Sequence, residues 1–151
     1  MTDRCNFRCG YCMPAEGLQW LQRSELLTFE EIERVARLLV ERHGIDSIRL
    51  TGGEPTVRAD LSRLVRMLAN LDVDLALTTN GATLGLAAAG LADAGLRRIN
   101  VSLDSLRADR FADLTLRDEL SRVLDGIDAA LSAGLDPVKI NVVVMRDVND
   151  D

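Results

Sequence analysis

Apolar residues recur along this chain with two different periods, and segments of the two kinds alternate. Four segments repeat apolar residues every three to four positions, which is the period of a helix that buries one face. Each is followed by a stretch of strand character, near 47–51, 75–79, 98–103 and 138–145. The helical stripes consist of Ile32, Val35, Ala36 and Leu39; Leu61, Leu64, Val65 and Leu68; Leu84, Ala87, Ala88 and Leu91; and Leu120, Val123, Leu124, Ile127 and Leu131.

The ends of these segments carry residues that begin and stop helices. Thr28-Phe29-Glu30-Glu31 fits a capping box, and Gly44, Gly95 and Gly134 each lie between a helical stripe and a strand. Repetition of this unit predicts a parallel sheet with right-handed crossovers. We therefore expect an α/β fold, a partial (β/α) barrel with parallel strands, formed by one domain over 1–151. Because few residues precede Cys5 and the chain stops just past a strand, we expect half of a larger barrel, truncated at both ends.

Polar side chains follow one face of every predicted strand. Buried parallel strands normally read as continuous Val, Ile and Leu, so a polar face predicts a barrel interior that meets a polar ligand or water. Arg49 and Lys139 on this face favour an anionic ligand that bears phosphate. The alternative is a one-sided sheet whose polar face meets solvent. The polar positions, two residues apart within each strand, are Arg49 and Thr51; Thr78 and Asn80; Asn100, Ser102 and Asp104; and Lys139 and Asn141.

Composition narrows the function classes. With 151 residues, 47% of them hydrophobic, the chain is long enough to bury one core. A net charge of -6 argues against nucleic acid as a partner, and no apolar run reaches the ~18 residues of a membrane span. Reduced cysteines and the lack of an export signal favour a cytoplasmic protein.

All three cysteines lie within eight residues, at Cys5, Cys9 and Cys12. This spacing can present three thiolates to one [4Fe–4S] cube and leave the fourth iron open to a small molecule. An odd number argues against a disulfide framework. Zinc or redox-active cysteines are the alternatives, and zinc would need a fourth ligand. The only histidine, His43, lies at the end of a predicted helix and suits a C-terminal cap.

A second candidate element is Gly52-Gly53-Glu54-Pro55, directly after the strand that contains Arg49. Loops at this end of α/β strands bind ligands, and two glycines let the backbone approach one closely. The Glu54 carboxylate could hold an ammonium group. A tight turn between strand and helix would explain the two glycines equally well.

These motifs together resemble those of the radical S-adenosylmethionine (SAM) enzymes, and further blocks are similar to the GTP 3′,8-cyclase family of molybdenum cofactor biosynthesis. The resemblance runs along the entire chain. The matching blocks are TDRCNFRC at 2–9, with Tyr11 before the third cysteine, Cys12-Met13-Pro14, RLTGGEP at 49–55, TTNG at 78–81, NVSLDS at 100–105 and MRDVND at 145–150.

The resemblance implies a radical SAM core of the TIM-like barrel type and a lyase reaction. Cys5, Cys9 and Cys12 would hold a [4Fe–4S] cluster at which SAM is cleaved reductively to a 5′-deoxyadenosyl radical. That radical would convert GTP to (8S)-3′,8-cyclo-7,8-dihydroguanosine 5′-triphosphate. The SAM contacts would be Tyr11, Gly52, Gly53, Glu54 and Ser102. Of these, Glu54 would receive the methionyl ammonium. The GTP contacts would be Arg49, Thr78 and Lys139.

The resemblance also implies partners and missing parts. It implies GTP and an electron donor as partners, and a homodimer for the full-length family member, with no role for nucleic acid or membrane. The family has a second, C-terminal three-cysteine cluster, but this sequence has no cysteine after Cys12. We therefore expect a fragment that does not complete the reaction alone. The alternatives are another radical SAM enzyme that modifies peptides, and a non-catalytic, metal-binding remnant.

Overall fold

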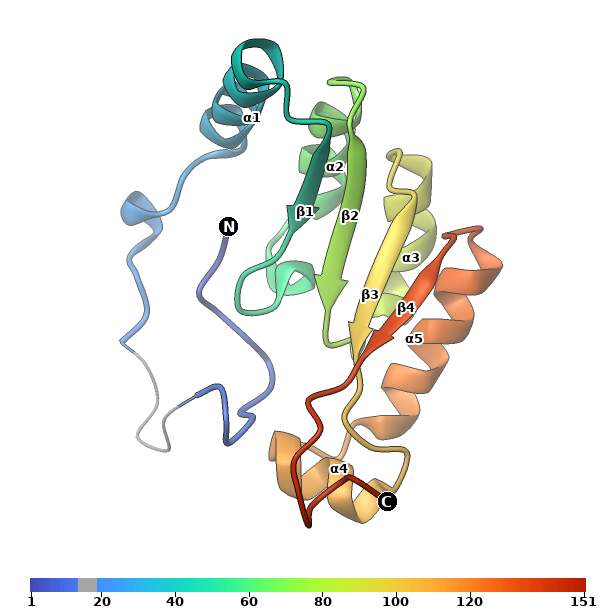
Figure 1. The fold of residues 1–151 in the computed structure, drawn as a ribbon. Helices are drawn as coiled ribbons and strands as arrows, with labels where there is room; N and C mark the ends of the chain where they lie inside the picture. The colour runs from blue at the N-terminus through green and yellow to red at the C-terminus, as the bar shows by residue number, and fades with distance from the viewer. Residues whose placement is uncertain (14–18) are drawn as a thin grey trace.

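Four parallel strands form one sheet in chain order, in a computed structural model that describes residues 1–13 and 19–151 (Figure 1). Pro14, the last residue of one of the matching blocks, lies outside the described residues. All three strand pairings are parallel, so the predicted α/β fold with a parallel sheet is confirmed. The strands are β1 (Ser47–Leu50), β2 (Asp74–Thr79), β3 (Arg98–Ser102) and β4 (Val138–Asn141).

Helices cover one face of this sheet. Figure 1 shows α2, α3 and α5 behind the strands, with the other face of the sheet turned toward the viewer. Between α1 and β1 the chain passes Gly44, and short 3-10 turns at Arg23–Glu25 and Pro55–Val57 complete the connections. The helices are α1 (Phe29–His43), α2 (Leu61–Ala69), α3 (Leu84–Asp93), α4 (Ala108–Thr115) and α5 (Leu120–Ser132).

The core lies between the sheet and α2, α3 and α5, as the two periods of the sequence predict. Leu75 and Leu77 of β2 and Ile99 and Val101 of β3 are at most 1% exposed. Each fully buried leucine or valine contributes about 1.5–3 kcal/mol relative to an exposed one, so this layer supplies most of the stabilisation of the sheet. The helical partners are Leu64, Val65, Leu68, Leu84, Leu91 and Val123, all 0% exposed.

The first helix begins and ends where the capping residues predict. The Thr28 side chain accepts a hydrogen bond from the Glu31 backbone at 3.2 Å, and Glu31 accepts one from the Thr28 backbone at 2.8 Å. Gly44 closes the helix with φ of 66°, a left-handed conformation in which glycine has no Cβ to clash. His43 is the last helical residue, as expected.

Three features differ from the sequence-based expectation. Helix α4 was not predicted. Two of its side chains are buried, and only one of them, Phe111, is large and apolar, so the segment has no apolar period. Strand β4 stops at Asn141, four residues before the predicted end at 145, because β3 ends at Ser102 and leaves 142–145 without a strand to pair with. In α1, the predicted stripe is only partly buried.

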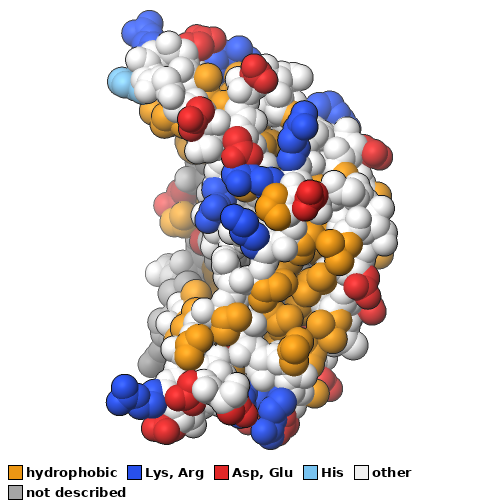
Figure 2. Space-filling model, turned by 45° about the vertical axis from the view of Figure 1, so that its right-hand side comes forward, with side chains coloured by type: hydrophobic (Ala, Val, Ile, Leu, Met, Phe, Trp, Pro, Cys, Tyr) orange, Lys and Arg blue, Asp and Glu red, His pale blue; other side chains and the backbone are white. Residues whose placement is uncertain are grey.

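Exposed apolar side chains mark the parts of the fold that no described element covers. Val35 and Leu39 of α1 are 49% and 38% exposed. A second group lies over β4 and α5, where Figure 2 shows hydrophobic side chains gathered on one side of the molecule. Its members are Leu124, Leu131, Ile140, Val142 and Val144. Among the helices in the described ranges, none is both long and apolar enough to cross a membrane.

Helix α5 crosses the turn after β2 so closely that only glycine fits. A Cβ on Gly126 would lie 2.5 Å from the Gly81 carbonyl oxygen and 3.0 Å from Leu84 Cβ. Both neighbours belong to the core layer, so neither can move away without disturbing it.

Replacing Gly126 with alanine should therefore destabilise the fold, although alanine is the better helix former. Overpacking costs about 1–3 kcal/mol, which exceeds the ~1 kcal/mol that alanine gains over glycine inside a helix. Urea unfolding followed by circular dichroism measures the change. Gly85→Ala in α3 is the matched control, because nothing lies within 4 Å of its Cβ position, and it should stabilise. Equal effects of the two substitutions would contradict the close packing.

Candidate metal and cofactor site

The three cysteines lie on one loop near the carboxyl ends of β2 and β3. Cys5 and Cys9 are half-buried, whereas Cys12 is exposed. A tight turn brings the third cysteine back toward the second, because the backbone N–H groups of Cys12 and Met13 both donate to the Cys9 carbonyl at 2.9 Å. The loop thus presents its thiols on one short stretch of backbone that is open to solvent at Cys12.

Helix α4, which the sequence did not predict, holds this loop. Phe7 is 3% exposed and packs edge-on against Phe111 of α4, with ring centroids 5.8 Å apart. Backbone hydrogen bonds of 3.0 and 3.2 Å run from Arg8 and Gly10 to the last turn of α4, at Thr115 and Leu114. Because the contacts come from both backbone and core, the position of the loop depends on α4.

The Gly-Gly turn holds the other side of the loop. The Gly53 backbone N–H donates to the Thr2 carbonyl at 2.8 Å, and that of Glu54 donates to the Arg4 carbonyl at 2.7 Å. A Cβ on Gly53 would lie 2.3 Å from the Arg4 carbonyl oxygen, and one on Gly52 would lie 2.5 Å from that of Thr2. The two glycines are therefore required by the close approach of the segment that leads to Cys5.

Glu54 is a buried carboxylate with a full set of donors. It is 1% exposed. Its Oε1 accepts from the Thr79 hydroxyl at 2.7 Å, the Thr56 hydroxyl at 2.6 Å and the Thr56 backbone at 3.0 Å, and Oε2 accepts from the Asn80 backbone at 2.6 Å. These bonds join the Gly-Gly turn to the end of β2. The expected role of Glu54 toward a methionyl ammonium stays a prediction, beside a structural role that the sequence did not reveal.

Asn80, the residue after β2, contacts the loop directly. Its Nδ2 donates to Asn6 Oδ1 at 2.7 Å and to Cys5 Sγ at 3.8 Å, and its Oδ1 accepts from the Ala82 backbone at 3.1 Å. The polar face of the predicted strands pointed to Asn80, but no sequence signal identified its partners.

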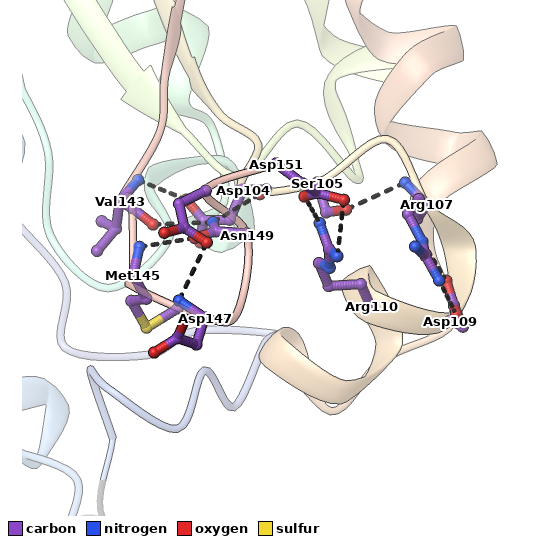
Figure 3. Close-up of polar contacts among 11 residues, drawn as sticks. Asp104, Ser105, Arg107, Asp109, Arg110, Val143, Met145, Asp147, Asn149 and Asp151 are labelled. Atoms are coloured by element: carbon purple, nitrogen blue, oxygen red, sulfur yellow. Dashed lines mark hydrogen bonds and ion pairs between the residues drawn. The ribbon is translucent and has the colours of Figure 1, made fainter.

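A second buried carboxylate, Asp104, joins the loop to the segment after β4. It is 7% exposed. Its Oδ2 accepts from the Tyr11 hydroxyl at 2.6 Å, and its Oδ1 accepts from the Val143 backbone at 2.9 Å. Figure 3 shows Asp104 beside Val143 and Asn149, whose side chain donates to the Asp104 and Val143 carbonyls. Tyr11, predicted to contact SAM, is thus fixed by a residue two positions after Ser102.

The surroundings of Cys5 and Cys9 raise the pKa of both thiols and so favour their protonated form. Burial raises the pKa of Cys5 above its usual value. Burial, followed by the neighbouring Cys5 and Cys12, raises the pKa of Cys9 to about 11. Partial burial and the hydrogen bond to Asp104 raise the pKa of Tyr11 as well. Metal ligation would therefore displace protons from the thiols, as is general for cysteine sites.

The predicted GTP residues lie on the sheet face opposite the helices. Thr78 pairs with Asn100, and Asn100 pairs with Lys139, so these three form one polar row across β2, β3 and β4. Arg49 is in the preceding row, opposite Ala76. Arg49 and Lys139 are both exposed and occupy the two edge strands, whose axes are roughly 14 Å apart at the usual strand spacing. Lys139 ends the polar row on β4, Arg49 lies one row earlier on β1, and their roles toward GTP remain predictions.

The three thiols of this loop could each bind a different iron of one iron–sulfur cube. Within 1–13 and 19–151, no three His, Cys, Asp or Glu side chains come close enough together to bind one metal ion. The three thiols lie on one short loop that hydrogen bonds and core contacts hold in place, so zinc and a cube both remain open until a metal is bound.

Comparison with known proteins agrees with this arrangement. The radical SAM superfamily pattern matches residues 1–151. The chain is 59% identical over 157 residues to the GTP 3′,8-cyclase of Acidothermus cellulolyticus and 52% identical over 152 residues to that of Rhodopirellula baltica. Each alignment covers 99% of this chain, but 43% and 42% of those relatives. The chain thus spans about two fifths of the length of the curated relatives it matches.

Solved structures share the fold at lower identity. The SAM-bound structure of Streptococcus suis SuiB has a TM-score of 0.75 at 22% identity, covering 97% of this chain and 33% of SuiB. Methylornithine synthase (PylB) has a TM-score of 0.71 at 17% identity, covering 99% of this chain and 44% of PylB. These likenesses concern the fold alone, and they agree with the predicted α/β fold of a partial barrel.

Replacing Gly53 with alanine should displace the segment before Cys5, because the added Cβ has no room beside the Arg4 carbonyl. We expect a loss of about 1–3 kcal/mol in the free energy of unfolding, and less iron bound per chain after anaerobic reconstitution although all three cysteines remain. Urea unfolding of the metal-free chain and a colorimetric iron assay measure the two effects. Gly85→Ala again serves as the control. Parental stability and iron content in Gly53→Ala would contradict the proposed packing of the turn.

Proposed function

The chain belongs to the radical SAM superfamily, and from this premise we propose that residues 1–151 act as the radical SAM core domain of a GTP 3′,8-cyclase. Enzymes of this superfamily use SAM and an iron–sulfur cluster. The observation that carries the proposal is the 52–59% identity to GTP 3′,8-cyclases over 99% of the chain. The cations on the polar sheet face support it, because a triphosphate needs them.

The residues of the loop would bind the cluster and the cosubstrate. When bound, a [4Fe–4S] cluster on Cys5, Cys9 and Cys12 supplies the electron for reductive cleavage of SAM, which yields the radical that acts on GTP. We assign the SAM contacts to Tyr11, Gly52, Gly53, Glu54 and Ser102. Asp104 follows Ser102 by two residues, and its hydrogen bond to Tyr11 holds Tyr11 near the carboxyl end of β3.

The polar face of the sheet would bind the substrate. Lys139 and Arg49 would neutralise phosphate charge from opposite edges, and Thr78 would donate a hydrogen bond between them. Charge-assisted bonds to phosphate are stronger than neutral ones, so these cations supply most of the affinity. The product would be the 3′,8-cyclised GTP, and the partners would be GTP and an electron donor, in a homodimer without nucleic acid or membrane. A reduced, cytoplasmic location suits the free thiols.

A peptide-modifying radical SAM enzyme is the competing function. SuiB, which has been solved with its precursor peptide, shares the fold at 22% identity. That identity is far below the 52–59% to the cyclases, so the cyclase is favoured. The test is whether the anaerobically reconstituted chain binds GTP, because we expect this fragment not to complete the reaction alone. Equilibrium dialysis with labelled GTP measures the binding. Saturable GTP binding supports the cyclase, and a chain that carries a full cluster and cleaves SAM but does not bind GTP contradicts it.

Cys9→Ala should abolish cluster binding and SAM cleavage, since it removes one of three thiolates. Iron content and the brown absorbance of the reconstituted chain measure the loss. Ser121→Ala, on the exposed surface of α5, controls for handling. A full cluster in the Cys9→Ala chain would contradict the assignment of Cys9 as a cluster ligand.

Lys139→Ala should weaken GTP binding but spare SAM cleavage. Loss of one charge-assisted contact costs roughly 1.5–3 kcal/mol, about ten- to hundredfold in affinity. Equilibrium dialysis with labelled GTP measures the affinity, and Arg34→Ala removes an exposed cation of α1 as the matched control. If the two variants bind GTP equally well, Lys139 has no phosphate role.

A further inference from the structure

Asn80 is a buried amide whose orientation is fixed by its neighbours. It is 9% exposed. Its Oδ1 accepts from the Ala82 backbone at 3.1 Å, so both hydrogens on Nδ2 are turned away from Ala82. They are directed at Asn6 Oδ1, 2.7 Å away, and at Cys5 Sγ, 3.8 Å away. A flipped amide would place an acceptor against Asn6 Oδ1 and a donor against the Ala82 N–H, which the network excludes.

The backbone of Asn80 is held as firmly as its side chain. Its N–H donates to Glu54 Oε2 at 2.6 Å. Glu54 is itself fixed by Thr79, the residue before Asn80, and by Thr56. Because a buried carboxylate is stable only while its donors stay in place, Glu54 restrains the position of Asn80 relative to the loop.

Cys5 receives a second N–H group from its own loop. The Phe7 backbone N–H lies 3.4 Å from Cys5 Sγ, on a residue that the core holds in place. Hydrogen bonds to the sulfurs of an iron–sulfur cluster set its reduction potential, together with charge and solvent exposure. An N–H dipole stabilises the more negative, reduced state more than the oxidised state, so each such bond raises the potential.

We propose that Asn80 is a positioning residue that fixes Cys5 and, through its N–H···S hydrogen bond, raises the reduction potential of the cluster; this rests on the cluster of the proposed function. Glu54 serves by holding the Asn80 backbone. The consequence is easier reduction of the cluster by its electron donor, together with a smaller driving force for electron transfer from the reduced cluster to SAM. Asn80 touches one ligand of the cluster and needs no contact with either SAM or GTP.

Two substitutions remove the donor in different ways. Asn80→Ser is neutral and keeps an oxygen that can accept from the Ala82 N–H, but its side chain is too short to reach Cys5. Asn80→Asp keeps the shape and the acceptor, and replaces the donor with a negative charge. Asn70→Ser and Asn70→Asp are the matched controls, because Asn70 is exposed at the end of α2.

The experiment is a redox titration of the reconstituted chains, followed by the EPR signal of the reduced cluster, with iron content and thermal unfolding measured on the same samples. We expect a lower midpoint potential for Asn80→Ser and a still lower one for Asn80→Asp, while both Asn70 variants keep the parental value. The shift should be present in chains that carry the parental amount of iron and without SAM.

Each other outcome overturns the proposal. A parental midpoint in loaded Asn80→Ser, even with less iron or a lower melting temperature, would leave Asn80 a purely structural residue. Failure of both Asn80 variants to load iron while both controls load would restrict Asn80 to cluster retention and exclude the tuning role. If the parent chain binds no cluster, the proposed function fails first, and this proposal fails with it.

Discussion

The buried carboxylate of Glu54 is the interaction on which the site depends. A charge that is 1% exposed is stable only when hydrogen bonds replace its water. Here four donors do so, from Thr56, Thr79 and Asn80. Its backbone meanwhile binds the Arg4 carbonyl, next to Cys5. One residue therefore links the end of β2, the Gly-Gly turn and the segment that leads into the cysteine loop.

The loop is held from three sides before any cofactor binds. The Gly-Gly turn fixes its start, α4 fixes its middle through Phe7 and Phe111, and Asp104 fixes Tyr11 between the second and third cysteines. Rigid support of this kind lowers the entropy cost of ordering ligands around a cluster. Cys12 is the one exposed thiol of the three.

Much of the fold follows from the sequence, because the helical period identified α2, α3 and α5, which pack on the sheet, and a capping box marked the start of α1. The capping box at Thr28 and the stripe of Leu61, Leu64, Val65 and Leu68 correspond to α1 and α2, and all four residues of that stripe are buried. Helix α4 could not be predicted in this way, because one phenylalanine does not make a period. The exposure of Val35 and Leu39 depends on what covers α1, which no local pattern records.

The site was only partly predictable, for a different reason. Spacing identified the three cysteines, and alternation identified the polar face with Arg49, Thr78 and Lys139. The buried partners of Glu54, Asn80 and Asp104 depend on which loops meet in space. A charged residue in a ligand-binding motif is therefore interpreted as a ligand contact, even where it also stabilises the fold. The residue types of the candidate site could thus be predicted from the sequence, whereas the hydrogen bonds that position these residues are seen only in the structure.

The most direct test of the account is the iron stoichiometry and EPR spectrum of the anaerobically reconstituted chain, reduced with and without SAM. Three anchored thiols and one open iron predict about four irons per chain and a signal that changes when SAM binds. A colourless chain that binds one zinc ion, or a full cluster whose spectrum ignores SAM, would contradict it.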